Sequence, residues 1–180
     1  MIEKIFGQTT TRAEIEKRFH DLLSSSGPAL LRLARSYTNN NSDRDDLFQD
    51  IALAIWQALP RFSNESSERT FVFRIAINRA LTFIAQRRHV TLINDEIEVP
   101  DWRPNPEKEF ARDQEESRLI EAIRNLPIDY RQVITLTLEG LSYAEIAGVL
   151  GIGESNVGVR LNRARQLLRK ILEVSSNERR

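Results

Sequence analysis

Residues 141–170 read LSYAEIAGVLGIGESNVGVRLNRARQLLRK, and this stretch decides the fold of the region around it. Ser142 and Glu145 form a capping-box pattern that predicts the start of a helix. Gly151 can supply the turn that ends this helix, and Ala147 is small where two helices must cross closely. The apolar residues that supply a shared core are Ile146, Leu150, Ile152, Val157 and Leu161. The stretch therefore predicts a helix-turn-helix.

The second helix of such a motif lies in the major groove of DNA. Its first side chains meet base edges, and side chains further along reach phosphates. The candidates here are Ser155, Asn156, Val159, Arg160, Asn162 and Arg163. A plain helical hairpin with a basic, solvated face is the alternative interpretation, because Ala and Gly also occur at such positions in ordinary helix pairs.

Helical periodicity continues over the rest of the 180 residues without a convincing alternating strand, so we expect an all-α protein. The first helix starts at the Thr11–Glu14 capping box and ends at Gly27-Pro28. Ser42 is expected to cap the third helix. The further helices are expected over residues 29–37, 42–58, 69–88, 113–125, 129–139, 142–150 and 154–172.

The stretch between these two sets of helices is acidic and contains Pro100, Pro104 and Pro106. Such a composition predicts a segment without a packed core of its own. We therefore expect two small helical domains, at residues 1–90 and 113–180, joined by a linker at residues 91–112.

Charge is balanced overall but unevenly distributed. The 26 basic and 26 acidic residues give no net charge, which argues against a protein that coats DNA by bulk electrostatics. Residues 69–92 nevertheless hold five arginines and no acid, namely Arg69, Arg74, Arg79, Arg87 and Arg88. Residues 154–180 are basic again. Two basic blocks are thus separated by an acidic bridge.

Several function classes find little support in the composition. The chain has no cysteine, only two histidines and no glycine-rich phosphate loop, so we expect no catalytic residues, no metal and no cofactor. The acids Asp43, Asp45, Asp46 and Asp50 suit a helix N-terminus better than a metal site. No leader pattern or long apolar run is present, so a soluble, cytoplasmic protein without membrane insertion is expected.

Two blocks of sequence resemble one known family. Residues 125–134 (NLPIDYRQVI), 139–147 (EGLSYAEIA) and 160–165 (RLNRAR) are similar to region four of extracytoplasmic-function (ECF) sigma factors of bacterial RNA polymerase. Residues 45–51 (DDLFQDI) and 71–80 (FVFRIAINRA), together with Trp56 and Arg61-Phe62, resemble region two of the same family. The two blocks stand in the family's order and span nearly the whole chain.

This resemblance implies a subunit of RNA polymerase that reads promoters and is not an enzyme. Its partners would be the largest and second-largest subunits of core polymerase, promoter DNA and an anti-sigma factor. The implied polymerase-docking residues are Asp45, Asp46, Gln49, Asp50 and Trp56. The region-four helix would read the minus-thirty-five element. The sequence departs from the common pattern of this family at Gly158-Val159 and at Ile77. The promoter sequence therefore cannot be carried over from relatives.

The resemblance also implies that residues 61–88 open and read the minus-ten element. Opening a duplex requires a group that replaces lost stacking, an amide for a flipped base, and cations for the single-strand backbone. Phe71, Asn78, and Arg74 with Arg79 could fill these roles in that order. The alternatives are that Phe71 is simple core, that Asn78 is merely exposed and that the arginines are solvated.

Two other functions stay open at the level of sequence. An autonomous helix-turn-helix transcription regulator would explain the C-terminal motif, with an N-terminal half that senses a signal or dimerises. It leaves the basic, acid-free helix at residues 69–88 without a role. An enzyme that acts on nucleic acid lacks supporting chemistry.

Overall fold

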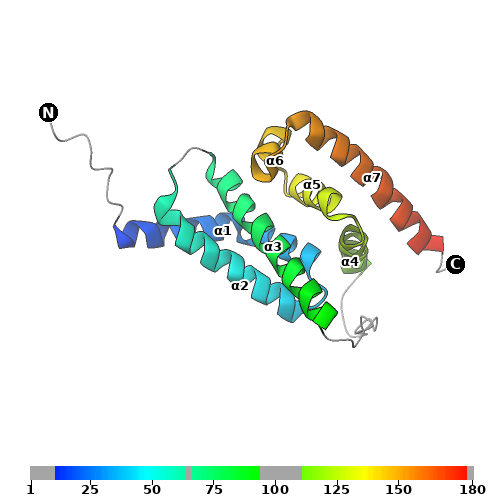
Figure 1. Ribbon diagram of the computed structural model, residues 1–180, viewed down its shortest axis with the longest axis horizontal. Helices are drawn as coiled ribbons and strands as arrows, with labels where there is room; N and C mark the ends of the chain where they lie inside the picture. The colour runs from blue at the N-terminus through cyan, green and yellow to red at the C-terminus, as the bar shows by residue number, and fades with distance from the viewer. Residues whose placement is uncertain (1–10, 64–65, 94–110, 178–180) are drawn as a thin grey trace.

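The computed structural model describes residues 11–63, 66–93 and 111–177, and within these ranges every element is a helix. They are α1 (Arg12–Tyr37), α2 (Asn41–Ala58), the 3-10 turn η1 (Leu59–Arg61), α3 (Glu68–Ile93), α4 (Ala111–Arg124), α5 (Ile128–Leu138), α6 (Tyr143–Leu150) and α7 (Glu154–Asn177). In Figure 1, α1 to α3 form one half of the molecule and α4 to α7 form the other. The all-α prediction is confirmed.

The expected linker falls largely outside the described residues. α3 continues to Ile93 and α4 begins at Ala111, and the stretch 94–110 between them is not described. The domain limits at residues 1–90, 91–112 and 113–180 therefore stay a prediction. None of the described helices is long and apolar enough to cross a membrane.

The expected break at Gly27-Pro28 is wrong, because α1 runs through both residues. A proline inside a helix removes one backbone hydrogen bond and clashes with the residue before it, partly through that residue's Cβ. Gly27 has no Cβ, which relieves part of the clash. Leu22 precedes the pair, Leu30 and Leu33 follow it, and all three are buried. Burial on both sides of the proline keeps the helix continuous.

The cap of α2 also differs from expectation. Asn40, not Ser42, is the N-cap, and its Oδ1 accepts the Asp43 backbone N–H at 2.8 Å. The Asn40 amide returns a hydrogen bond to the Asp43 carboxylate at 3.0 Å. Asp43 is buried and also pairs with Arg87 of α3. The helix starts where Asp43 can satisfy both partners, so Asp43 is a structural residue that ties α2 to α3.

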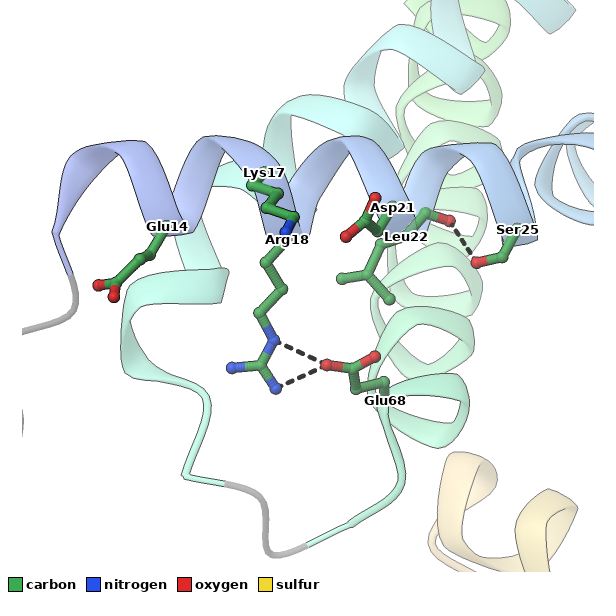
Figure 2. A pocket seen from close by; sticks show the side chains of 7 residues that line it. All are labelled: Glu14, Lys17, Arg18, Asp21, Leu22, Ser25 and Glu68. Atoms are coloured by element: carbon green, nitrogen blue, oxygen red, sulfur yellow. Dashed lines mark hydrogen bonds and ion pairs between the residues drawn. The ribbon is translucent and has the colours of Figure 1, made fainter.

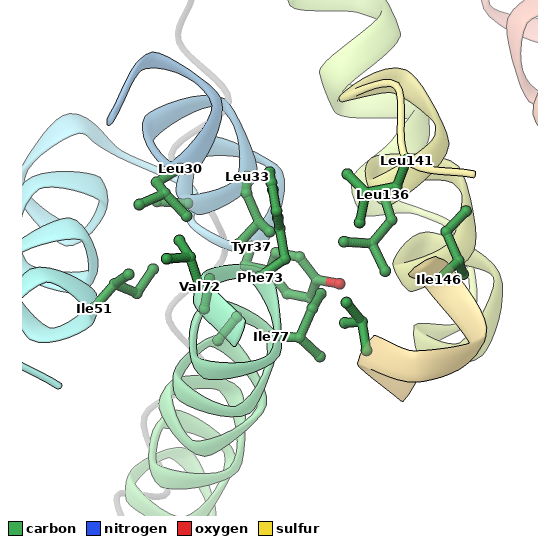
Figure 3. Packing of buried hydrophobic residues seen from close by; sticks show 14 of the residues in the cluster. Leu30, Leu33, Tyr37, Ile51, Val72, Phe73, Ile77, Leu136, Leu141 and Ile146 are labelled. Carbon is green, nitrogen blue, oxygen red and sulfur yellow. The ribbon is translucent and has the colours of Figure 1, made fainter. Parts of the chain in front are cut away.

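A continuous apolar core joins the two halves. In Figure 3, Phe73 and Ile77 of α3 lie between Leu30 and Leu33 on one side and Leu136, Leu141 and Ile146 on the other. Helix α3 packs against α6, and α1 packs against both α4 and α5. The surfaces of α3 and of the helix-turn-helix are therefore held close together in this structure.

Candidate nucleic-acid interface

The helix-turn-helix forms as the sequence predicts. Ser142 caps α6: its hydroxyl accepts the Glu145 N–H at 3.2 Å, and the Glu145 carboxylate accepts the Ser142 N–H at 2.8 Å. The Ser142 hydroxyl also donates to this carboxylate at 2.8 Å, and the two hydrogen bonds that the carboxylate accepts from Ser142 hold the pKa of Glu145 below its ordinary value. Gly151 ends the helix with a φ of +67°, a conformation that favours glycine. Local chemistry thus fixes the angle at which α7 departs.

Helix α7 buries one face and exposes the opposite one. Val157, Leu161 and Ala164 are fully or almost fully buried, at helical spacing. The remaining face carries five of the six residues predicted to meet DNA in exposed positions: Ser155, Asn156, Val159, Asn162 and Arg163. The structure therefore brings these five together on one accessible surface.

Arg160, the sixth predicted residue, is partly covered. Its Nε donates to the Asn156 Oδ1 at 3.1 Å, and its Nη2 lies 3.5 Å from the Asp129 Oδ2 at the start of α5. The guanidinium is therefore oriented by one neighbour on its own helix and one on α5. Such fixed orientation is what two-point recognition of a base edge requires.

Tyr143 is a residue of this surface that sequence reasoning missed. It is 44% exposed at the first turn of α6, and its ring reaches the space beside Gly158, where a Cβ would lie 3.6 Å from the ring. Val159, the next residue, is 51% exposed. The absent side chain at Gly158 was visible in the sequence, but the ring that lies against it was not. Together they make a small apolar area on the exposed face.

The second predicted group lies on α3. Phe71 is half-buried and its ring centroid is 4.4 Å from that of Phe62, while the Arg18 guanidinium lies over the Phe62 ring at 5.0 Å. Asn78 and Arg79 are exposed. Phe71 therefore packs against a neighbouring ring and is still partly exposed, so its role in opening a duplex stays a prediction.

The arginines of α3 are more engaged than the charge pattern indicates. Arg74 donates to the Gly148 carbonyl at 2.7 Å, and Arg69 donates to the Glu139 carbonyl. Arg87 pairs with Asp43 and lies over the Phe83 ring at 5.3 Å. The Arg88 side chain is outside the described residues. Arg69, Arg74 and Arg87 therefore bind partners within the chain in this structure, although all three are exposed.

The predicted docking residues lie along α2. Asp45, Asp46, Gln49 and Asp50 are exposed, and Asp45 pairs with the adjacent Arg44 at 2.8 Å. Trp56 is half-buried and meets Phe19 of α1 edge to face, with ring centroids 5.2 Å apart. The acidic face is accessible, whereas Trp56 also stabilises the first half. Across the described ranges no cluster of metal-ligating side chains occurs.

A shallow pocket lies at one end of the first half, between α1 and the start of α3. In Figure 2 the Arg18–Glu68 ion pair, at 2.6 Å, crosses it. Its lining is mostly charged: Glu14, Lys17, Arg18, Asp21, Leu22, Ser25 and Glu68. None of these residues belongs to the predicted sites.

Comparison with known proteins relates both halves to one family. The family models for Sigma-70 region 2 and Sigma-70 region 4 match residues 22–90 and 116–168. The RNA polymerase sigma factor NccH of Alcaligenes xylosoxydans xylosoxydans is 34% identical over 163 residues, which cover 87% of this chain and 88% of NccH. The ECF RNA polymerase sigma-E factor of Haemophilus influenzae is 30% identical over 166 residues, which cover 85% and 86% of the two chains.

The fold has a counterpart among solved structures. The sigma factor RpoE of Bartonella quintana, solved with the anti-sigma factor NepR, superposes with a TM-score of 0.73 at 24% identity over 88% of this chain and 98% of that chain. The chain belongs to the extracytoplasmic-function family of RNA polymerase sigma factors. It is a transcription initiation factor that directs promoter-specific transcription. An autonomous regulator is not favoured, because the first half matches sigma region two.

Proposed function

We propose that this protein binds core RNA polymerase through the acidic face of α2 and reads promoters with two separate surfaces. Helix α7 reads the minus-thirty-five element, and α3 opens and reads the minus-ten element. One observation carries the proposal: each of the two matched sigma regions contains an exposed group of residues whose chemistry suits its role.

At the minus-thirty-five element, the N-terminal part of α7 enters the major groove. Asn156 and the oriented Arg160 supply donors for base edges, and Val159 supplies an apolar contact. Arg163 lies further from the helix N-terminus, so it binds a phosphate instead. Ser155 lies at the N-terminal end of this surface, and Asn162 directly precedes Arg163.

At the minus-ten element, the protein replaces the stacking of a base that leaves the duplex. Phe71 offers a ring that Phe62 already supports, and the exposed amide of Asn78 can bind the edge of a flipped base. Arg74 and Arg79 neutralise the single-strand backbone. For Arg74 this requires release from the Gly148 carbonyl.

Docking on polymerase uses the exposed Asp45, Asp46, Gln49 and Asp50, with Trp56 at the far end of α2. The partners are the largest and second-largest subunits of core polymerase, promoter DNA and an anti-sigma factor, since the related RpoE was solved with one. The protein acts in the cytoplasm, where polymerase and promoters are, and it catalyses no reaction of its own.

Affinity purification of the tagged protein separates this function from its alternative. Core polymerase subunits should co-purify in a fixed ratio, and the isolated protein should bind promoter duplex weakly, because its balanced charge gives few phosphate contacts. A self-sufficient dimer that binds duplex tightly, and from which polymerase is absent, would favour the autonomous regulator.

A further inference from the structure

Two phenylalanine rings stand at the two ends of the loop between η1 and α3. Phe62 directly follows η1, where its backbone N–H donates to the Leu59 carbonyl at 3.1 Å, and Phe71 lies in the first turn of α3. Their ring centroids are 4.4 Å apart, with the ring planes tilted by 34°. Both rings are half-buried. Phe62 therefore supports the ring that we propose to replace lost stacking at the minus-ten element.

Arg18 of α1 contacts both ends of this loop. Its Nε donates to the Glu68 Oε1 at 2.7 Å, and its Nη2 lies 2.6 Å from the same oxygen. The Cζ of the same guanidinium lies over the Phe62 ring, 5.0 Å from the ring centroid. Figure 2 shows the Arg18 side chain reaching from α1 across to Glu68 at the start of α3. One cation of α1 thus contacts a ring at one end of the loop and a carboxylate at the other.

The start of α3 is ordered by contacts of its own. The Ser67 Oγ accepts the Thr70 backbone N–H at 3.1 Å and lies 2.9 Å from the Thr70 hydroxyl. The Phe71 backbone N–H donates to the Ser67 carbonyl at 3.0 Å. These local hydrogen bonds cap the helix and fix the backbone at Phe71 without Arg18. The place of the Phe62 ring depends instead on its contacts with Arg18 and Phe71.

The contacts of Arg18 are too exposed to hold the fold together. The Arg18 side chain is 33% exposed and that of Glu68 is 46% exposed. Exposed ion pairs and exposed cation–π contacts add little to the free energy of unfolding. Energies of that size still change the population of one ring arrangement about fivefold. Loss of Arg18 should therefore change how the two rings are arranged and leave the helices intact.

We propose that Arg18 is a positioning residue for promoter opening. Anchored by Glu68, it fixes the Phe62 ring, and Phe62 in turn fixes the Phe71 ring that receives the unpaired base. The inference rests on the proposed function of Phe71 at the minus-ten element. Arg18 acts through Phe62 and does not itself bind DNA. If the rings without Arg18 keep the receiving arrangement for about a fifth of the time, the apparent affinity for the opened strand falls about fivefold.

Glu68 distinguishes positioning from simple attraction of DNA. Removal of an acid close to a strand-binding surface should strengthen DNA binding if only charge matters. Under the proposal, Glu68→Gln takes away the anchor of Arg18 and should lower open-complex formation on duplex by about threefold, the loss typical of one exposed ion pair. The two explanations therefore predict effects of opposite sign for the same variant.

Open-complex formation by holoenzyme, on a duplex promoter obtained from run-off start-site mapping, tests the proposal. Arg18→Ala should form about fivefold fewer open complexes at the unaltered melting temperature of the free protein. Arg18→Lys keeps a cation over the ring and should stay within about twofold of the unaltered chain. Arg12→Ala is the matched control, because it removes an exposed pair with Glu16, at 3.0 Å, on the same helix, and it should change nothing.

A double substitution shows whether Arg18 acts through Phe62. Arg18→Ala should add no further loss when Phe62→Ala is already present, because the ring that transmits the effect is gone. A further fivefold loss in that background, with a reduced dependence of binding on salt concentration, would show that Arg18 binds a phosphate directly and would overturn the proposal. Wild-type opening by Arg18→Ala, or stronger opening by Glu68→Gln, would overturn it as well.

Fluorine NMR of the free protein separates this inference from the proposed function. With 4-fluorophenylalanine incorporated at Phe71, Arg18→Ala should shift the fluorine resonance, whereas Arg12→Ala should not. An unshifted resonance in Arg18→Ala would contradict positioning alone, whatever the promoter does. A shifted resonance, together with wild-type opening by Phe71→Ala, would contradict the proposed role of Phe71 and leave the positioning of its ring by Arg18 supported.

Discussion

The Arg160 guanidinium donates to the Asn156 side chain at 3.1 Å, one turn earlier on α7. Asp129 of α5 lies on its other side at 3.5 Å. Two residues predicted to meet base edges are therefore linked, and their contributions to promoter recognition should be coupled. Arg163, three residues beyond Arg160, is exposed and outside this pair.

Replacement of these two arginines should have different consequences. Arg160→Ala should weaken promoter binding by about 1 to 3 kcal/mol and relax the sequence preference at one base pair, as expected for loss of a base-edge contact. Arg163→Ala should weaken binding to all upstream sequences alike and reduce the dependence of that binding on salt concentration. A library of minus-thirty-five variants, transcribed by each mutant holoenzyme, measures both effects. Wild-type rates and salt sensitivity for both mutants would show that α7 is not the reader.

Val159 should recognise a thymine methyl group, because it is the exposed apolar side chain on the outer face of α7. Replacement of one thymine by deoxyuridine removes that methyl group. With the unaltered protein, this replacement should weaken promoter binding by about 0.8 kcal/mol. Val159→Ala should lose most of this discrimination. Open-complex formation on matched templates gives the measurement. Equal sensitivity of both proteins at every thymine of the element would exclude this contact.

Substitutions of Asn78 and Phe71 should differ in their effects on promoter opening and on the stability of the fold. Asn78 is exposed, so Asn78→Ala should lower open-complex formation on duplex and leave the melting temperature unchanged. Phe71 packs against Phe62, so Phe71→Ala should also destabilise the first half, by about 2 kcal/mol. Phe62→Ala is the matched control for lost packing. Activity of Asn78→Ala at the wild-type level, on both duplex and a pre-melted bubble, would remove Asn78 from the site.

The acids of α2 should divide into docking and structural residues. Reversal of charge at Asp46 and Asp50 should abolish association with core polymerase while helicity is retained, since both are exposed. Asp43→Lys should instead unfold or loosen the first half, because Asp43 is buried and paired with Arg87. Co-purification and circular dichroism of the variants report the two properties. Undiminished co-purification of the Asp46 and Asp50 variant would place the docking face elsewhere.

The sequence predicts what local chemistry decides. The cap at Ser142, the turn at Gly151 and the buried stripe of α7 depend on residues a few positions apart, and each is found as expected. The helix end predicted at Gly27-Pro28 is absent, because burial of residues on both sides of the proline outweighs the loss of one backbone hydrogen bond.

Contacts between residues far apart in the sequence could not be predicted from local patterns. Arg32 and Glu139 are 107 residues apart, and no periodicity relates them. The arginines of α3 stand in an acid-free stretch of sequence, yet Arg69 and Arg74 bind backbone carbonyls of the other half, which a count of acidic neighbours cannot reveal. The close packing of the two halves is thus a property of the tertiary structure alone.

Run-off transcription with purified core polymerase tests the central claim most directly. Core with this protein should initiate at discrete sites in a promoter library, and the aligned upstream sequences should share two short elements near minus ten and minus thirty-five. Core alone should not initiate there. Identical start sites with and without the protein, or nanomolar sequence-specific duplex binding by the protein alone at physiological salt, would contradict its assignment as a sigma factor.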